Sequence, residues 1–253
     1  MLQRLLLPLA VIFLFCCDPR AKKNLSDRKE KIFRIDNTTL SRDQVTRKQS
    51  SIIYCRERGI PVIDHLPCVT SEAEVKIRSN DDIINRALAL CYLGLKSEGL
   101  EKKHLDGFNK KYLIAPHFTK EEKLYVYATT PLEEQRVNAS WRYEGMHVLL
   151  WALGYVDSLA YPDQMCNVEE DVKLILDRTK AEFSTGVKIR SKQEILDQAD
   201  LIYRLHWACV NAKIKNEEPP AGLNASVVYE RHYALNWLIR YMEQEWDEVS
   251  TDT

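Results

Sequence analysis

Apolar side chains recur along this chain at the three- and four-residue spacing that is typical of α-helices. The clearest case is the stretch over residues 188–212, where two neighbouring stripes are apolar. The two stripes hold Ile195, Ala199, Ile202 and Cys209 on one side and Leu201, Leu205 and Ala208 on the other. A helix that is apolar on two faces needs neighbours on both, so we expect this helix to be sandwiched between others.

Helix-start signals occur along most of the chain. In the capping box, Ser/Thr-x-x-Glu/Gln, the first and last side chains each satisfy a free backbone N–H at the start of a helix. This motif or a close variant begins at Ser41, Ser79, Thr119, Thr130 and Ser191. With Gly and Pro as stop signals, the pattern predicts helices over residues 41–58, 79–99, 101–109, 119–127, 130–154, 168–183 and 191–212, and from 227 onward.

These elements predict an all-α (mainly α) fold, formed by a single multi-helix domain with little or no sheet. A short strand near Val62 and Ile63 is the one exception that the pattern allows. The phrase KIRS occurs at residues 76–79 and again at 188–191, and apolar matches continue after both copies. This similarity favours two related helical units packed together, although two capped amphipathic helices can also resemble each other by chance.

The first residues have a different character from the rest. An apolar run over residues 5–15 follows Arg4 and ends beside Cys16 and Cys17. The run is too short to span a bilayer and is typical of a secretory signal. Residues 1–17 resemble a bacterial lipoprotein signal, in which Cys17 would be lipidated and would hold the protein on a membrane. An ordinary cleaved signal peptide and an unprocessed segment are the alternatives.

A charged segment separates this signal from the helices. Residues 18–50 hold ten Lys or Arg and five Asp or Glu. We interpret residues 18–40 as a tether and 41–253 as the helical domain. The tether could lie against anionic head groups or act as a solvated linker. The expected location is therefore outside the cytoplasm, on the periplasmic or cell-surface side, as a membrane-anchored lipoprotein.

Composition narrows the possible partners. Apolar residues make up 45% of the 253 residues and charged residues 29%, which is typical of a globular chain. The net charge of −1 gives no reason to expect nucleic acid as a partner. The cysteine spacings fit no zinc motif, and Cys55 and Cys68 could form a disulfide without anything that requires it. With no glycine-rich phosphate loop, we expect no cofactor.

Polar residues inside the best-patterned helix are the first candidates for a binding site. Asp197, Asp200 and Arg204 form a ladder, because they lie about one helical turn apart. With His206 and Trp207 they could form the wall of an anion site, in which Arg204 clamps the ligand and Trp207 stacks on it. The structural alternative is an internal ion pair that fixes the packing of the helix.

Arg142, Glu144, Arg190 and Arg231 are four further candidates. Arg142 and Glu144 cannot face each other at a spacing of two, so each needs a partner elsewhere, and Arg231 and Glu230 are suitable. A ligand pocket and an interhelical ion network are both compatible with these residues. Arg190, like Arg78 in the first repeat, precedes a helix start, where it could help to bind an anion or pair with a carboxylate of the other unit.

The histidines and cysteines give weaker signals. His147, His206 and His232 lie on three predicted helices and would bind a metal only if they converged. Without an HExxH motif or a second histidine four residues on, we expect no metal site. No nucleophile motif such as GxSxG is present.

Several long segments resemble the domain-of-unknown-function 4272 family, which is found mainly in bacteria. They are residues 141–144 (WRYE), 149–154 (LLWALG), 190–191 (RS), 194–197 (EILD), 200–208 (DLIYRLHWA), 230–238 (ERHYALNWL), 246–247 (WD) and 252–253 (DT). The resemblance covers roughly residues 45–253 and implies a helical fold without an assigned activity. The signal and tether are additions to this pattern.

Two functional hypotheses follow. The first is a membrane-tethered helical binding or interaction domain without catalysis, whose partner is an unknown protein or small molecule. The second is an enzyme with hydrolase-like acid/base chemistry at a polar site between the helices that carry Trp141 and Trp207. The second requires the candidate side chains to converge on a solvent-reachable pocket.

Overall fold

The computed structural model describes residues 40–253, so the predicted signal and almost all of the tether lie outside the described residues. The described part holds nine α-helices and four 3-10 helices, and no strand. The α-helices are α2 (Arg42–Glu57), α3 (Asn80–Ser97), α4 (Lys102–Tyr112), α5 (Lys120–Val126), α6 (Glu133–Ala152), α7 (Val168–Leu176), α8 (Lys180–Thr185), α9 (Lys192–Ile214) and α10 (Ala225–Leu238). The all-α prediction is confirmed, and the strand near Val62 does not form.

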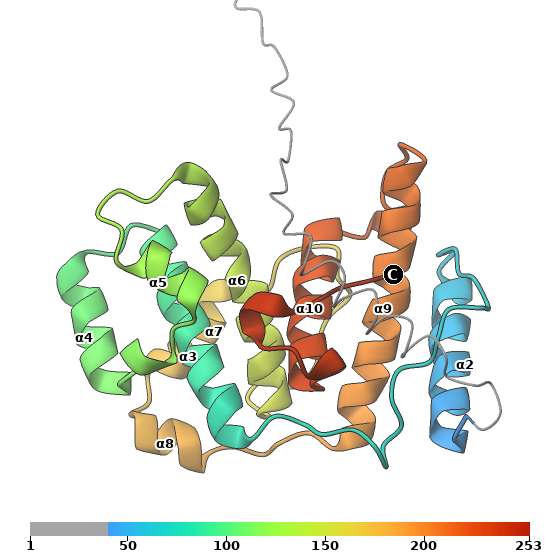
Figure 1. Ribbon diagram of the computed structural model, residues 1–253, viewed down its shortest axis with the longest axis horizontal. Helices are drawn as coiled ribbons and strands as arrows, with labels where there is room; N and C mark the ends of the chain where they lie inside the picture. The colour runs from blue at the N-terminus through green and yellow to red at the C-terminus, as the bar shows by residue number, and fades with distance from the viewer. Residues whose placement is uncertain (1–39) are drawn as a thin grey trace, which may run out of the picture. The chain divides into compact units, whose positions relative to one another are not determined.

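The long helices stand side by side in the order α3, α6, α10, α9 and α2 (Figure 1). Each packs on the next, and α4, α5 and α8 pack against α3. The second half of α6 is at the centre of the core, with Met146, Leu149 and Leu150 fully buried, as the apolar run there predicts. Helix α9 lies between α10 and α2, which confirms that both of its apolar faces are covered.

Each KIRS segment begins a stretch of helices, which we call the first unit (residues 76–152, from α3 to α6) and the second unit (residues 188–238, with α9 and α10). Each segment caps a helix of the other unit. The backbone N–H of Arg78 donates to the carbonyl of Leu238 at the end of α10, at 3.0 Å. The backbone N–H of Arg190 donates to the carbonyl of Ala152 at the end of α6, at 2.9 Å. Carbonyls of a last helical turn have no partner inside the helix, so each repeat supplies what the other unit lacks.

The side chains of Arg78 and Arg190 also contact the helix end that their backbone N–H groups cap. The Arg78 guanidinium donates to the carbonyl of Trp237 and lies 4.9 Å from the centre of its ring. The Arg190 guanidinium donates to the carbonyl of Trp151 and lies 5.7 Å from that ring. Helices α6 and α10 lie between α3 and α9 (Figure 1), so the two units pack on each other through α6 and α10.

Two predicted helices differ from those observed. The segment over residues 168–183 forms two helices, because Thr179 and Glu182 make a capping box that starts α8. Helix α6 begins at Glu133 rather than at Pro131, because the Gln135 side chain accepts the N–H of Leu132 and fixes the start there.

Two further observations bear on the earlier expectations. All five cysteines of the described residues are free thiols, so Cys55 and Cys68 are not joined. No helix within residues 40–253 combines the length and the apolar character that crossing a membrane requires.

Candidate functional site

A groove of about 680 Å³ runs between α2 and α9. Thr46 and Ser50 line it from α2 at the four-residue spacing that puts them on one face, and Gln193 and Gln198 line it from α9. Thr46 and Ser50 are exposed, so the groove is open to solvent. Hydroxyl and amide groups that face an open concave surface are suited to bind a polar ligand.

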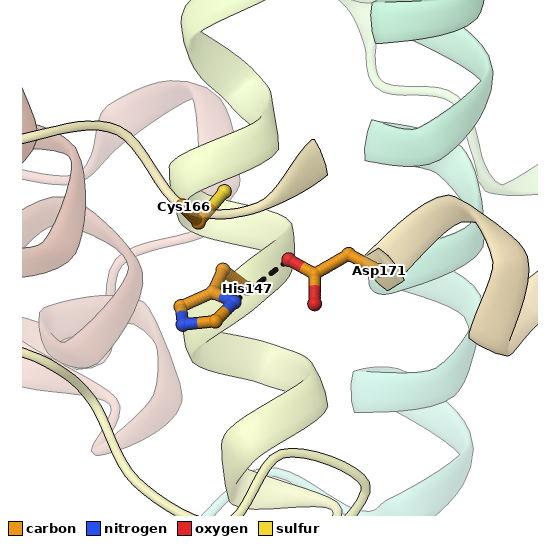
Figure 2. Close-up of side chains that lie close together, drawn as sticks. All are labelled: His147, Cys166 and Asp171. Carbon is orange, nitrogen blue, oxygen red and sulfur yellow. Dashed lines mark hydrogen bonds and ion pairs between the residues drawn. The ribbon is translucent and has the colours of Figure 1, made fainter. Parts of the chain in front are cut away.

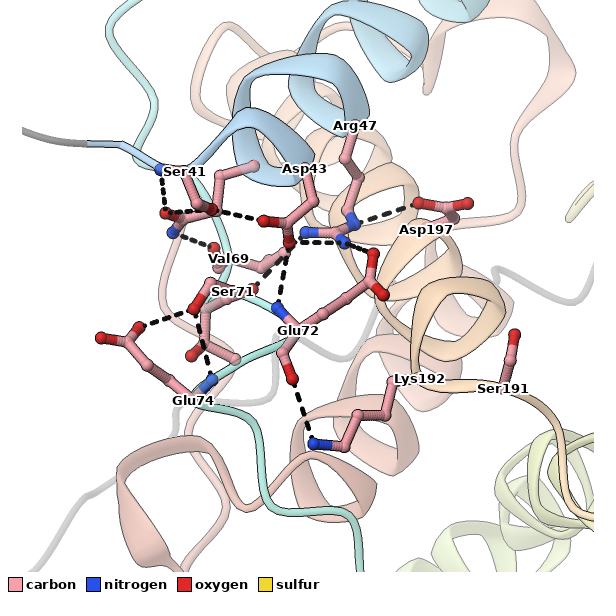
Figure 3. A network of polar contacts seen from close by, with 12 residues as sticks. Ser41, Asp43, Arg47, Val69, Ser71, Glu72, Glu74, Ser191, Lys192 and Asp197 are labelled. Atoms are coloured by element: carbon pink, nitrogen blue, oxygen red, sulfur yellow. Dashed lines mark hydrogen bonds and ion pairs between the residues drawn. The ribbon is translucent and has the colours of Figure 1, made fainter.

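A buried arginine organises one wall of this groove (Figure 3). The Arg47 guanidinium contacts three carboxylates, those of Asp43 at 3.2 Å, Glu72 at 3.4 Å and Asp197 at 3.0 Å. Its side chain is 2% exposed, whereas that of Asp197 is 47% exposed. Arg47 therefore ties α2, the segment before α3 and α9 together, and it leaves one face of Asp197 in the groove.

The charges of the groove do not cancel. Its lining holds two arginines, Arg42 and Arg47, against the three carboxylates of Asp43, Glu72 and Asp197, which leaves a net charge of −1. The hydroxyl of Ser41 donates to Asp43 and, with the Glu72 backbone N–H and Arg47, lowers the pKa of Asp43 to about 2. Asp43 is therefore ionised at neutral pH, and the groove favours neutral or cationic ligands.

Arg142, Glu144 and Arg231, the candidates from α6 and α10, form two ion pairs between these helices. Arg142 contacts Glu230 at 3.1 Å, and Arg231 contacts Glu144 at 3.0 Å. Glu144 is fully buried, Arg231 is 3% exposed, and burial raises the pKa of Glu230 despite the nearby Arg142. These side chains hold α6 and α10 together, and none of them lines the α2–α9 groove.

The three ladder residues on α9 belong to two different places in the structure. Asp200 and Arg204 form a two-point ion pair at 2.8 and 2.9 Å, and the two side chains are 1% and 0% exposed. Arg204 also donates to the carbonyl of Pro67, which anchors the loop between α2 and α3. Asp197, by contrast, belongs to the α2–α9 groove. Trp207 is half-buried and packs against the core.

His206 and His232 converge, and His147 pairs elsewhere. The Nδ1 atoms of His206 and His232 lie 2.9 Å apart, so one ring donates and the other accepts. Burial lowers the pKa of His206 to about 4. Burial, together with the neighbouring His206, also holds the pKa of His232 well below its ordinary value. Both rings are neutral at pH 7 and form a contact between α9 and α10.

The proposed enzyme site between the Trp141 and Trp207 helices is divided by α10, which packs on α6 on one side and on α9 on the other (Figure 1). The candidates on α6 and those on α9 therefore belong to different interfaces. Arg190 lies at neither interface, because it donates to the carbonyls of Trp151, Val156 and Asp157 and closes the end of α6.

A cysteine, a histidine and an aspartate meet near the middle of α6. His147 contacts Asp171 at 2.7 Å, and Cys166 lies beside them. Burial and the carboxylates of Glu144 and Asp171 raise the pKa of the Cys166 thiol. A protonated thiol is a weak nucleophile, so this trio is not poised for nucleophilic catalysis.

A comparison of the sequence with protein-family models gives a match. The family model described as Domain of unknown function (DUF4272) matches residues 47–249. The chain belongs to the DUF4272 family. No curated protein and no solved structure matches it.

The DUF4272 match covers part of the groove lining. It begins at Arg47, so the guanidinium in the groove wall and its partners Glu72 and Asp197 lie inside the matched range. Arg42 and Asp43 precede it. Sequence reasoning missed Arg47 as a site residue, although Asp43 and Arg47 have the four-residue spacing of a helical ion pair.

Proposed function

We propose that this chain is a membrane-tethered helical binding or interaction domain without catalysis, which binds a small polar or cationic molecule in the groove between α2 and α9. The observation that carries this proposal is the open groove of about 680 Å³ with a surplus of carboxylates. Asp197 is the central recognition group, because it is half-exposed and fixed by Arg47.

The enzyme alternative has less support. It needs Arg142 and Glu144 to converge with Asp197, Asp200, Arg204 and His206 on one reachable site. Glu144, Asp200 and Arg204 are fully buried, and these three and Arg142 are engaged in ion pairs. Asp197 is half-exposed, but it lines the α2–α9 groove, which the other five residues do not line. We therefore assign these residues a structural role in the proposal.

A thermal-shift experiment tests the groove. Arginine, lysine and spermidine serve as cationic probes, with glutamate and glucose for comparison, and binding to the folded state raises the melting temperature. We expect at least one cationic probe to raise it. Ser50→Trp fills the groove and should abolish the shift, whereas Gln49→Trp, at an exposed position on the same helix that is outside the groove lining, should keep it.

Two results contradict the groove assignment. One is that none of the cationic probes changes the melting temperature of the unmodified protein. The other is that the shift persists unchanged in Ser50→Trp, which would place the binding site elsewhere.

The proposed location is that of an exported bacterial lipoprotein, anchored through Cys17 and facing the periplasm or the cell surface. It rests on the apolar run over residues 5–15 that ends beside this cysteine. Mass spectrometry of the mature protein should find Cys17 at the N-terminus with acyl chains attached. Cys17→Ser should move the protein into the soluble fraction, and an unmodified N-terminus at Met1 would refute the anchor.

A further inference from the structure

Three side chains of metal-ligand type gather beside α6 (Figure 2). His147 comes from α6, Cys166 from the loop that follows it and Asp171 from α7. One potential ligand atom from each, a ring nitrogen, the thiol sulfur and a carboxylate oxygen, lies within 4.8 Å of the other two. The site is separate from the α2–α9 groove, and none of its residues lines that groove.

The surrounding residues hold this cluster in place. Glu144 lies one turn before His147 and therefore on the same face of α6. One Glu144 oxygen accepts the backbone N–H of Cys166, and the other accepts the guanidinium N–H of Arg231 at 3.0 Å. The Cys166 thiol donates to the carbonyl of Tyr143 at 3.7 Å. The loop is thus fixed against α6 at the residue that carries the sulfur.

The cluster has a buried carboxylate without a lysine or arginine partner among the described residues. Asp171 is 3% exposed, and within residues 40–253 its only ion-pair contact is His147, with no lysine or arginine. A buried carboxylate is costly unless a cation or several donors compensate its charge. The His147 side chain is 12% exposed, so the cluster is not completely enclosed.

We propose that His147, Cys166 and Asp171 bind one Zn²⁺ ion, with each residue supplying one ligand and water completing a tetrahedron. In tetrahedral zinc sites the ligand atoms lie about 2.0–2.3 Å from the metal, which places them roughly 3.3–3.7 Å from one another. The three ligand atoms lie within 4.8 Å of one another and the His147–Asp171 contact is 2.7 Å, so side-chain shifts of about 1 Å bring the atoms to that separation.

The ligand types determine which ion fits. Imidazole and thiolate favour zinc and related transition metals, whereas Mg²⁺ and Ca²⁺ prefer sites built entirely from oxygen. Glu144 would not contact the ion itself. It would orient the Cys166 ligand, because it accepts the backbone N–H of Cys166. The residues are 19 and 5 positions apart along the chain and on different segments, so no sequence motif marks them.

Metal binding to the purified full chain tests the proposal, with Zn²⁺ and Co²⁺ as the probes. We expect one Zn²⁺ per chain in competition with a chelating dye, and no competition from Mg²⁺ or Ca²⁺. Co²⁺ should give a thiolate-to-metal charge-transfer band in the unmodified protein. Cys166→Ser should remove this band, and His147→Gln and Asp171→Asn should each weaken Zn²⁺ binding about tenfold or more.

Matched variants separate this site from other cysteines and histidines. Cys68→Ser and His104→Gln lie outside the cluster and should bind Zn²⁺ like the unmodified protein. The absence of a charge-transfer band in the unmodified protein overturns the proposal without depending on the folding of any variant. Zn²⁺ affinity that is the same in Cys166→Ser, His147→Gln and Asp171→Asn also overturns it.

Discussion

The interior of this domain contains charges that are almost completely removed from water. Arg204 and Asp200 are the extreme case, and Arg204 is also among the largest fully buried side chains. A buried pair adds little net stability over apolar residues of the same size, but the loss of one partner leaves an uncompensated charge in the core. Such pairs therefore fix one arrangement of the helices more than they strengthen it.

This arrangement predicts a large difference between single and double substitutions at the Asp200–Arg204 pair. Asp200→Leu should lower the free energy of unfolding by about 3–5 kcal/mol, because Arg204 is left buried without its counter-charge. The double variant Asp200→Leu/Arg204→Met should recover most of that loss. Urea denaturation measures both. Arg136→Ala, which breaks an exposed pair, should cause no measurable change, and equal effects of the single and double variants would contradict the prediction.

The histidine pair should make the domain sensitive to acid. The pKa of His206 is about 4 in the folded protein and near 6.5 when the chain is unfolded, so the unfolded state binds more protons between these values. Stability should therefore fall as the pH decreases from 6.5 to 4, by about 1.4 kcal/mol per pH unit for this histidine. His206→Gln should reduce this slope in urea denaturation at several pH values, whereas the exposed His104→Gln should not.

At the residue scale, the sequence indicated which charged side chains could pair, but not which of them come into contact in the folded chain. The four-residue spacing of Asp200 and Arg204 was sufficient to predict their pairing. Glu144 could be recognised as needing a partner, yet Arg231 lies 87 residues away, and only the packing of α6 on α10 joins them. Arg47 was missed because two of its three carboxylate partners, Glu72 and Asp197, come from segments far away in the sequence.

Among the elements, α3 and α6 pack against each other at a glycine. The Gly94 Cα faces the ring of buried Tyr143, and a Cβ at this position would overlap the ring atoms. Glycine weakens a helix interior by roughly 1 kcal/mol relative to alanine, so its presence in α3 has a packing reason. The absent side chain allows the two central helices to approach each other.

Two glycine substitutions should therefore change stability in opposite directions. Gly94→Ala should destabilise the protein by about 1 kcal/mol or more, because overpacking against Tyr143 exceeds the gain in helix propensity. Gly107→Ala in α4 meets nothing within 4 Å and should stabilise by roughly 0.5–1 kcal/mol. Thermal melts compare the two, and stabilisation by both would mean that the α3–α6 contact is looser than described.

Helix starts were the most predictable features at this scale, because a cap depends on side chains only three residues apart. The boxes at Ser79 and Ser191 form as expected. The box at Thr179 went unrecognised within a continuous polar-apolar pattern, and α7 and α8 were merged as a result. A capping box that lies inside a continuous apolar pattern is therefore easily overlooked.

For the whole molecule, the order of the helices decides which residues can meet. The sequence pattern placed polar residues on the Trp141 and Trp207 helices correctly, but nothing in it indicated that α10 packs between them. The groove and the His147 cluster are likewise products of the arrangement of whole helices. Sites formed by side chains that lie far apart in the sequence depend on this arrangement, which periodicity does not encode.

The crossed caps have a further consequence for how the molecule opens. The Arg78 and Arg190 amides bond to the ends of α10 and α6, so separating the two units breaks both bonds at once. Native-state hydrogen exchange should give these two amides the same opening free energy and the same denaturant dependence. Distinct values would show independent fraying. Equal opening free energies would mean that neither unit opens alone. A protease or a chaperone would then encounter the domain either closed or with its two units separated.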